Sequence, residues 1–211
     1  MRNISLKAML IASALSIVTM PAMAKDLGDG PFAKERFQVR VRIIDVAPDE
    51  SSSVNIGGKA DVDFAVVPEL DLTYFFTPHI AAELIAATSK HDLTYTGNVN
   101  LGDAWILPPT LTLQYHFAPD SKFSPYLGAG LNYSLFYGED TASGFTNLKV
   151  DGGVGYALQA GADYWIDEHW GLNLDVKKLW LNVDASLNNG AIKADVDLDP
   201  WIFGAGVSYR F

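Results

Sequence analysis

The chain has 211 residues and no cysteine, and its 15 Lys and Arg face 25 Asp and Glu, a formal net charge of −10. The acidic balance argues against a nucleic-acid partner, and the absence of cysteine excludes disulfides and thiolate metal sites. Hydrophobic residues make up 49% of the chain, yet beyond the N-terminal region no run of about 18 apolar residues is present to form a spanning helix.

The first residues have the features of an export signal. Arg2 and Lys7 form a positive start, a short apolar run follows, and Ala22-Met23-Ala24 matches a small-x-small cleavage site. An uncleaved membrane anchor is the alternative, but the run is short for a spanning helix. We expect residues 1–24 to be a cleaved signal peptide and residues 25–211 to form a single domain.

Eight later segments alternate apolar and polar side chains with a period of two, which is typical of β-strands. In chain order, we expect strands at residues 37–46, 67–76, 80–88, 110–117, 125–137, 154–166 and 170–179, and a last strand that ends at Phe211. The connections after the second, fourth and sixth strands are short, and those after the other strands are long. This alternation matches the tight periplasmic turns and extended external loops of an outer-membrane barrel.

The last strand shows the pattern most clearly. Apolar side chains occupy every second position up to the terminal aromatic residue: Phe203, Ala205, Val207, Tyr209 and Phe211. Glycine, serine and Arg210 occupy the other face, as a barrel interior requires. We interpret Val207, Tyr209 and Phe211 as a C-terminal signal for barrel assembly. The closing strand of a soluble sheet is the alternative.

The expected fold class is therefore all-β: an eight-stranded antiparallel transmembrane β-barrel with short periplasmic turns and long extracellular loops. Strands of about 9 to 11 residues cross a bilayer when tilted, and a closed ring leaves no unpaired backbone edge in lipid. Aromatic residues such as Tyr74, Tyr115 and Trp170 lie near the expected periplasmic ends, where an interfacial belt is found.

Four segments resemble the outer-membrane protein W (OmpW) family: residues 41–48 (VRIIDVAP), 107–111 (LPPTL), 125–133 (PYLGAGLNY), and 198–201 (LDPW) through to Arg210-Phe211. The similarity covers nearly all of the chain after residue 24. It implies an eight-stranded barrel with a narrow, partly hydrophobic channel that admits small hydrophobic molecules and releases them sideways into the membrane. Some members of this family also serve as bacteriocin receptors. Loop residues 138–152 cannot be matched to the family, so its gate residues are not transferred.

Strand parity places charged side chains inside the barrel, in the periplasmic half or near mid-depth. They are Arg40, Arg42, Glu69, Asp71, Glu83, Asp163, Asp175, Lys177 and Arg210. Sequential antiparallel strands pair, so Arg40 and Arg42 should lie beside Glu69 and Asp71. An eight-stranded barrel is only just wide enough to be filled by its side chains. We expect a salt-bridged floor that blocks the pore; the alternative is that these charges only pack the barrel.

The external half differs from this floor. Aromatic residues near strand ends, and glycines that remove volume from the wall, are the candidates for an apolar vestibule: Trp105, Gly128, Gly130, Phe136, Phe145 and Trp180. A hydrophobic solute would enter this vestibule from outside and leave sideways, because the floor closes the direct route. Loop anchoring by the aromatic residues is the alternative.

The expected function is a channel for small hydrophobic molecules in the cell outer membrane. Its expected partners are the hydrophobic solute, outer-membrane lipid and lipopolysaccharide, the barrel-assembly machinery, and a bacteriocin or phage as an external ligand. Two alternatives stay open: a structural, receptor or adhesin barrel that acts through its extracellular loops, and a soluble periplasmic ligand-binding barrel with its apolar face inside.

We expect no catalytic activity, no cofactor and no metal site. A hydrolase needs a nucleophile with a histidine base in reach, and Ser89 with His91 is too weak a pattern to indicate such a dyad. The acidic positions Asp195, Asp197 and Asp199 lack the glycine and closing glutamate of a calcium loop. Divalent cations prefer oxygen ligands, so these carboxylates could share such cations at the lipopolysaccharide surface. A solvated loop face explains them better.

Overall fold

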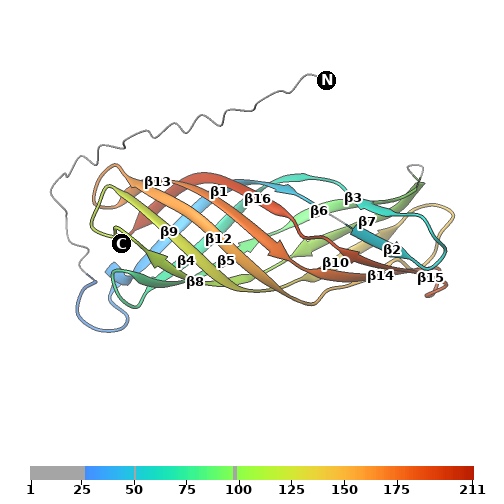
Figure 1. Ribbon diagram of the computed structural model, residues 1–211, viewed down its shortest axis with the longest axis horizontal. Helices are drawn as coiled ribbons and strands as arrows, with labels where there is room; N and C mark the ends of the chain where they lie inside the picture. The colour runs from blue at the N-terminus through green and yellow to red at the C-terminus, as the bar shows by residue number, and fades with distance from the viewer. Residues whose placement is uncertain (1–26, 50, 97–98) are drawn as a thin grey trace, which may run out of the picture.

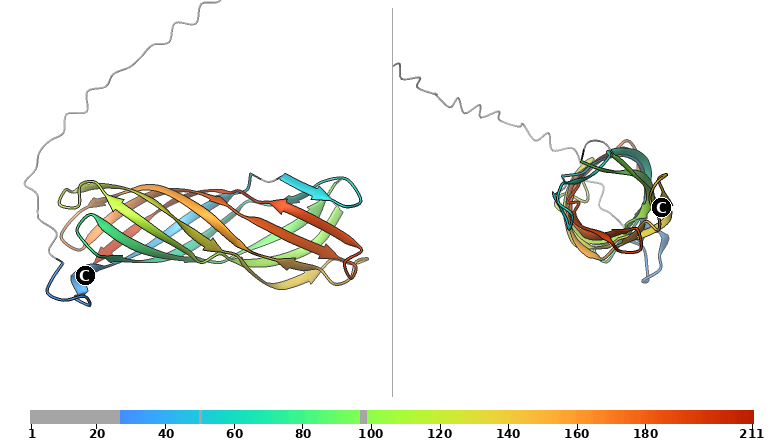
Figure 2. Two further views of the ribbon diagram at one scale, coloured as in Figure 1. Left: turned by 60° about the horizontal axis from the view of Figure 1, so that its bottom comes forward. Right: turned by 90° about the vertical axis from the view of Figure 1, so that its right-hand side faces the viewer.

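The computed structural model describes residues 27–49, 51–96 and 99–211, and they form a closed antiparallel barrel (Figure 1). The eight barrel strands are β1 (Phe37–Ala47), β4 (Ala65–Phe75), β5 (Ile80–Ala87), β8 (Thr110–His116), β9 (Phe123–Tyr133), β12 (Val154–Trp165), β13 (Trp170–Trp180) and β16 (Trp201–Arg210). Each pairs with the next in chain order, and β1 pairs with β16 to close the ring (Figure 2). The predicted fold class is confirmed.

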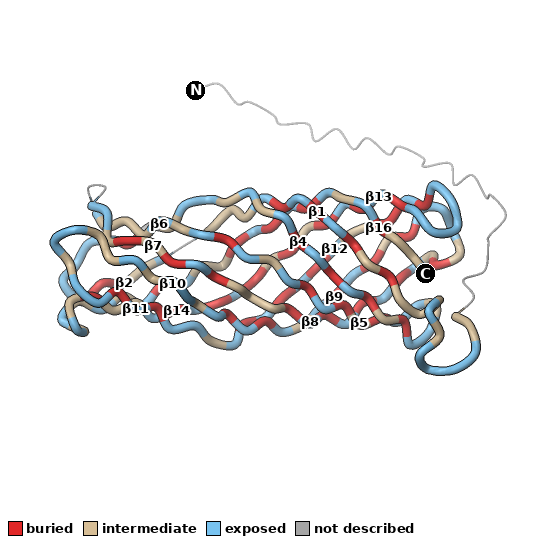
Figure 3. The backbone as a smooth tube through the Cα atoms, turned by 180° about the vertical axis from the view of Figure 1, so that it is seen from behind, coloured by how far each residue is buried: buried red, intermediate tan, exposed pale blue. Residues whose placement is uncertain are grey.

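Buried and exposed residues alternate along the barrel strands (Figure 3). The exposed ones are mainly apolar and the buried ones mainly polar, the inverse of a water-soluble sheet. On β4, Leu72 is 45% exposed, whereas its neighbour Asp71 is 1% exposed. On β13, Leu174 is 68% exposed and Asp175 is 3% exposed. Water would penalise so many exposed aliphatic side chains, whereas the acyl chains of a bilayer solvate them.

The external connections are built largely of further strands. These are β2 (Ser51–Val54), β3 (Ala60–Val62), β6 (Ser89–Tyr95), β7 (Val99–Leu107), β10 (Leu135–Thr141), β11 (Lys149–Asp151), β14 (Asn182–Leu187) and β15 (Ile192–Asp197). They form two four-stranded sheets, ordered β10-β7-β6-β3 and β11-β14-β15-β2, which lengthen the barrel on the side away from the C-terminus. The segment 125–137, predicted as one strand, is divided at Ser134 into β9 and β10. The three-residue strands β3 and β11 carry too little alternation to be seen in sequence alone. In β6, β7 and β10, irregular pairing interrupts the alternation.

The periplasmic end carries the three short turns and the aromatic side chains predicted there. Tyr209 makes edge contacts with Trp170 and Phe211, at ring-centroid distances of 4.8 and 5.0 Å. A single-turn 3₁₀ helix, η1 (Lys34–Arg36), precedes β1. None of the described helices is long and apolar enough to cross a membrane. The signal peptide predicted at residues 1–24 lies outside the described residues.

Candidate functional site

A charged layer crosses the barrel interior. The register places Arg40 of β1 opposite Asp71 of β4, and Arg42 opposite Glu69. Three cations and five carboxylates from five strands meet in this layer, and each of them is buried: Arg40, Arg42, Lys177, Glu69, Asp71, Glu83, Asp163 and Asp175. We call these eight residues the charged floor.

The two arginines hold the floor together. Arg40 Nη1 lies 2.8 Å from Glu83 Oε1, and Arg40 Nη2 lies 2.9 Å from Asp163 Oδ2. Arg42 Nη2 lies 2.5 Å from Asp71 Oδ2 and 3.0 Å from Glu83 Oε1. Both guanidinium groups therefore contact Glu83, and each links several strands because its planar fork presents donors in fixed directions.

Arg42 extends the network toward the external side. Its Nε lies 2.9 Å from Glu69 Oε1, at ion-pair distance but without the geometry of a linear hydrogen bond. Its Nη1 lies 3.3 Å from Asp175 Oδ2. Lys177 Nζ then donates to Glu69 Oε1 at 2.8 Å and to Asp175 Oδ1 at 2.9 Å.

Neutral polar side chains that the sequence analysis did not single out complete the floor. Glu83 Oε2 accepts hydrogen bonds from Gln114 Nε2 at 2.7 Å and from Gln159 Nε2 at 2.8 Å. The Tyr126 hydroxyl donates to Asp175 Oδ2 at 2.8 Å. The same parity argument that located the charges applies to these residues, because they occupy inward positions on their strands. Buried carboxylates need such donors to offset their lost hydration.

Arg210 is not joined to this network. It lies near the periplasmic end, with its guanidinium carbon 3.8 Å from the centroid of the Trp165 ring, and it forms no ion pair with any carboxylate of the described residues. The register explains this position, because Arg210 pairs with Gln38 at the last rung of β16. Arg210 therefore faces the interior, as parity predicts, and stacks on the buried Trp165. The prediction that it belongs to the ion-paired floor is wrong.

An apolar cavity lies on the external side of the floor. On β1, β5 and β13, the inward positions change from charged to aliphatic toward the outside: Ile44 follows Arg42, Ile85 follows Glu83, and Leu179 follows Lys177. The cavity is lined mainly by aliphatic side chains, with Glu69 and Lys177 at its base. A second cavity, farther out, shares its lining residues Ala60, Leu101, Leu148, Ala185 and Ala194 with the first. The apolar lumen thus continues from the charged floor into the two external sheets.

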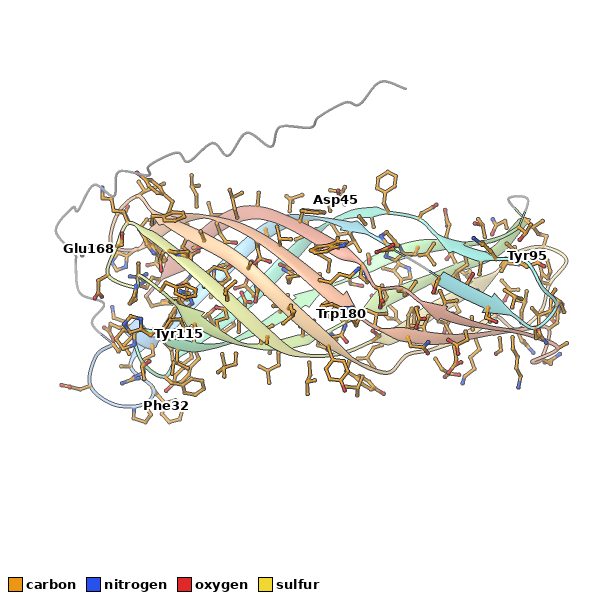
Figure 4. The ribbon with its side chains drawn as sticks, in the orientation of Figure 1. Phe32, Asp45, Tyr95, Tyr115, Glu168 and Trp180 are labelled. Carbon is orange, nitrogen blue, oxygen red and sulfur yellow. The ribbon has the colours of Figure 1, made fainter. Side chains whose placement is uncertain are left out.

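The structure divides the six predicted vestibule residues. Phe136 lines the inner cavity and Phe145 lines the outer one. Trp105 and Trp180 instead occupy outward positions and are 37% and 39% exposed. Trp180, at the end of β13, is labelled in Figure 4. Parity gives the reason, because Ala104 and Ile106 on either side of Trp105 face the lumen. The prediction that these two tryptophans line the vestibule is wrong.

The two glycines also differ from the expectation. Gly128 faces the interior at the level of the floor, where an added Cβ would lie 2.9 Å from Gln159 Oε1. At Gly130, an added Cβ would lie 1.9 Å from the carbonyl oxygen of Leu111. Gly130 therefore permits close approach of β8 and β9, and neither glycine widens the apolar cavity.

Ser89 and His91 meet in the wall of the cavity. Ser89 Oγ lies 2.8 Å from His91 Nε2, and His91 Nδ1 lies 2.8 Å from the carbonyl oxygen of Asp63. Both side chains border the inner cavity. The two residues occupy the same face of β6, two positions apart, which the sequence analysis treated as too weak a pattern to indicate a dyad.

The remaining predicted positions are found as follows. Val207 and Phe211 point outward at the end of the barrel, and Tyr209 packs between Trp170 and Phe211. Asn182 Nδ2 donates to Asp195 at 2.5 Å and to Asp197 at 2.9 Å. Within the described part of the chain, no three acidic or histidine side chains are grouped so as to hold a metal ion.

A closed barrel with an apolar outer surface, a charged floor inside and an apolar external lumen is the architecture of an outer-membrane β-barrel protein. The model of the OmpW family matches residues 33–211, and the chain belongs to this family. Its location is accordingly the outer membrane, in contact with lipid and lipopolysaccharide.

Individual relatives agree with this assignment. The chain is 45% identical over 206 residues to the uncharacterized outer-membrane protein y4mB of Sinorhizobium fredii, covering 94% of this chain and 90% of the relative. It is 32% identical to outer membrane protein W of Escherichia coli, covering 96% and 99% of the two chains. The crystal structure of OprG from Pseudomonas aeruginosa superposes with a TM-score of 0.79 at 36% identity, covering 83% of this chain and 95% of that one.

Proposed function

We propose that the protein is a passive channel that carries small hydrophobic molecules from the external surface into the membrane. The observation that carries this proposal is an apolar lumen that ends on a buried, ion-paired floor. A hydrophobic solute gains free energy by entering such a lumen. It does not cross the floor, because displacing paired buried charges is costly. The solute therefore leaves through the wall.

The arrangement of the external strands supports a lateral exit. Among the described residues, the ladder is interrupted between β10 and β11, and again between β2 and β3, where the two external sheets adjoin. At the second of these seams, the Ser52 hydroxyl bonds to the backbone of Ala60. A seam without a continuous ladder opens at lower cost than a strand pair does, since fewer backbone hydrogen bonds are lost.

Uptake by cells tests the channel directly. Ala104→Trp places a large side chain in the inner cavity, whereas Ala205→Trp places the same side chain on the lipid-facing surface of β16. Cells that produce the wild-type protein should take up the neutral dye N-phenyl-1-naphthylamine faster than cells without it. Ala104→Trp should remove this difference, and Ala205→Trp should retain it. Equal uptake with and without the wild-type barrel would refute the proposal.

We propose further that the barrel has no hydrolytic activity, although Ser89 and His91 are hydrogen-bonded. The two residues lie on one strand with the carbonyl of Asp63 behind the histidine, and a nucleophilic site also requires donors that stabilise an oxyanion. Purified wild-type protein and Ser89→Ala should hydrolyse 4-nitrophenyl decanoate at the same background rate. A rate that Ser89→Ala abolishes would show that the barrel is an enzyme.

The alternative is a receptor or adhesin barrel that acts through its external sheets. The outer face of β11, β14 and β15 favours it, because Asp151, Asp184 and Asp195 lie opposite one another in register and form a long acidic row. A bacteriocin or phage protein is the ligand class for such a role. Recognition of Val207, Tyr209 and Phe211 by the barrel-assembly machinery is a separate proposal, supported by their outward position on the final strand.

A further inference from the structure

The base of the inner cavity combines one charged acceptor and one charged donor in a mainly aliphatic lumen. Glu69 and Lys177 are the charged residues that line it. Glu69 uses Oε1 for both Lys177 and Arg42. Its second oxygen, Oε2, takes part in none of the hydrogen bonds or ion pairs formed among the described residues. Lys177 Nζ donates two of its three protons, to Glu69 and Asp175.

The free acceptor, Glu69 Oε2, and the third proton of Lys177 Nζ together match the hydrogen-bonding capacity of a hydroxyl group. A hydroxyl donates one hydrogen bond and accepts others, so it satisfies Glu69 Oε2 and the third Lys177 proton at the same time. A pure hydrocarbon leaves both positions unpaired in an apolar space, which is unfavourable. The solute that fits best is therefore amphipathic, with its polar end on the floor and its chain along the lumen.

The charge of the floor decides which polar end is accepted. Three buried cations face five buried carboxylates, so negative side chains outnumber positive ones by two. At the cavity base itself, Lys177 is flanked by both Glu69 and Asp175. An additional carboxylate would be repelled there, and the repulsion is only weakly screened because the layer is buried.

We infer that the channel selects hydrophobic molecules with an uncharged hydroxyl head group over carboxylates with the same carbon chain, and that Glu69 determines this preference. The inference rests on the proposed function, because it presupposes that a solute occupies the lumen. The hydrogen-bonded Ser89–His91 pair is a second polar position in the wall, but its hydroxyl and both ring nitrogens already have partners.

Competition binding tests the inference. Wild-type protein in lipid nanodiscs is loaded with N-phenyl-1-naphthylamine, which 1-decanol or decanoate then displaces at pH 8. The ratio of the two affinities is compared between proteins, because partition into lipid is the same for each. Glu69→Gln should shift this ratio toward decanoate by about 10-fold or more, since it removes a negative charge within a few ångströms of the head group. Asp175→Asn should shift it in the same direction by a smaller factor.

The control is Glu168→Gln, the same change in an exposed periplasmic turn, which should leave the ratio unchanged. Folding of each variant is checked by its migration in unheated gels. If Glu69→Gln does not fold, the affinity ratio of Asp175→Asn is compared with that of the wild type instead. An unchanged ratio in both floor variants, or a shift in Ser89→Ala instead, would overturn the inference while the channel proposal stands. If neither decanol nor decanoate displaces the dye from the wild type, the proposed function itself fails.

Discussion

At the scale of single residues, Arg42 is the centre of the floor. It lies within ion-pair distance of Glu69, Asp71, Glu83 and Asp175, on three neighbouring or facing strands. Replacing a whole buried ion network by apolar groups is often tolerated, whereas removing one partner leaves unpaired charge in a medium that solvates it poorly. Arg42 is therefore the single side chain whose loss should most disturb both the stability of the barrel and its closure.

Arg42→Ala should lower the free energy of unfolding by about 3–5 kcal/mol, because it leaves buried carboxylates without their cation. It should also raise ion conductance in a planar bilayer, since the floor would no longer fill the barrel. Arg36→Ala is the control, because Arg36 bonds to the backbone of Phe75 and Phe76 outside the lumen. Unchanged conductance in Arg42→Ala would show that the floor does not block the pore.

At the scale of strands, close approach of backbones depends on glycine at particular rungs. A Cβ on Gly130 would meet the Leu111 carbonyl, and a Cβ on Gly206 would lie 2.0 Å from the carbonyl oxygen of Val41. Backbone atoms within a closed ring cannot move aside without breaking the ladder. We therefore expect the barrel to need glycine at these two positions in order to form.

Gly130→Ala should reduce the fraction of protein that folds, seen as loss of the fast-migrating band in unheated gels. Gly153→Ala is the matched control, because the nearest atom to its added Cβ would be 3.8 Å away. The alanine at position 153 should leave the folded fraction as in the wild type. Normal folding of Gly130→Ala would mean that β8 and β9 separate more easily than their register indicates.

The turn between β12 and β13 has a pH dependence of its own. Asp167 Oδ1 accepts hydrogen bonds from the backbone N–H groups of Trp170 at 2.7 Å and His169 at 2.8 Å, and these bonds lower the pKa of Asp167 below its usual 3.8. Because the pKa is lower in the folded turn than in the unfolded chain, the carboxylate stabilises the turn above about pH 4. That contribution is lost as the pH falls through the folded pKa.

An NMR titration of the Asp167 carboxyl carbon should give a midpoint below 3.8. In Asp167→Asn, the amide shifts of the turn should no longer change over this pH range. A midpoint at or above 3.8 would contradict the capping role.

At the scale of the whole molecule, the rows of outward apolar side chains and inward polar side chains determine how the barrel is placed in the membrane. The same alternation continues into the two external sheets, where the outer positions become polar, as Asp184 and Asp195 illustrate. The length of the apolar outer band therefore sets how deep the barrel sits in lipid. The band reaches the base of β10, beside the seam with β11, where Leu135 and Tyr137 are exposed apolar residues. The polar outer parts of the external sheets stand beyond it.

Leu174→Arg should lower the free energy of unfolding in lipid vesicles by about 2–4 kcal/mol, because it places a charge on the lipid-facing surface near mid-depth. Asp184→Arg, on the outer face of β14, should change the free energy by less than about 0.5 kcal/mol. Equal effects of the two substitutions would contradict the proposed depth of the barrel in the membrane.

Local periodicity was enough to predict the barrel strands and the direction of their side chains. Alternation between lipid-facing and lumen-facing positions is a property of consecutive residues, so Leu70, Asp71 and Leu72 could be assigned to opposite faces without a structure. The same rule, applied farther along each strand, would have placed Ile44 and Leu179 in the lumen and Trp105 outside it. Trp105 and Trp180 were wrongly assigned to the vestibule because they were grouped with other aromatic residues by type and not by strand parity.

What the tertiary structure alone decided is how distant residues meet across the lumen. Glu83 joins Arg40, Arg42, Gln114 and Gln159 from other strands, and no local pattern specifies such partners. The apolar cavity and the pairing of short external strands likewise depend on barrel closure. Periodicity is a property of one strand, whereas the floor, the cavity and the seams exist only where several strands face one another across a ring.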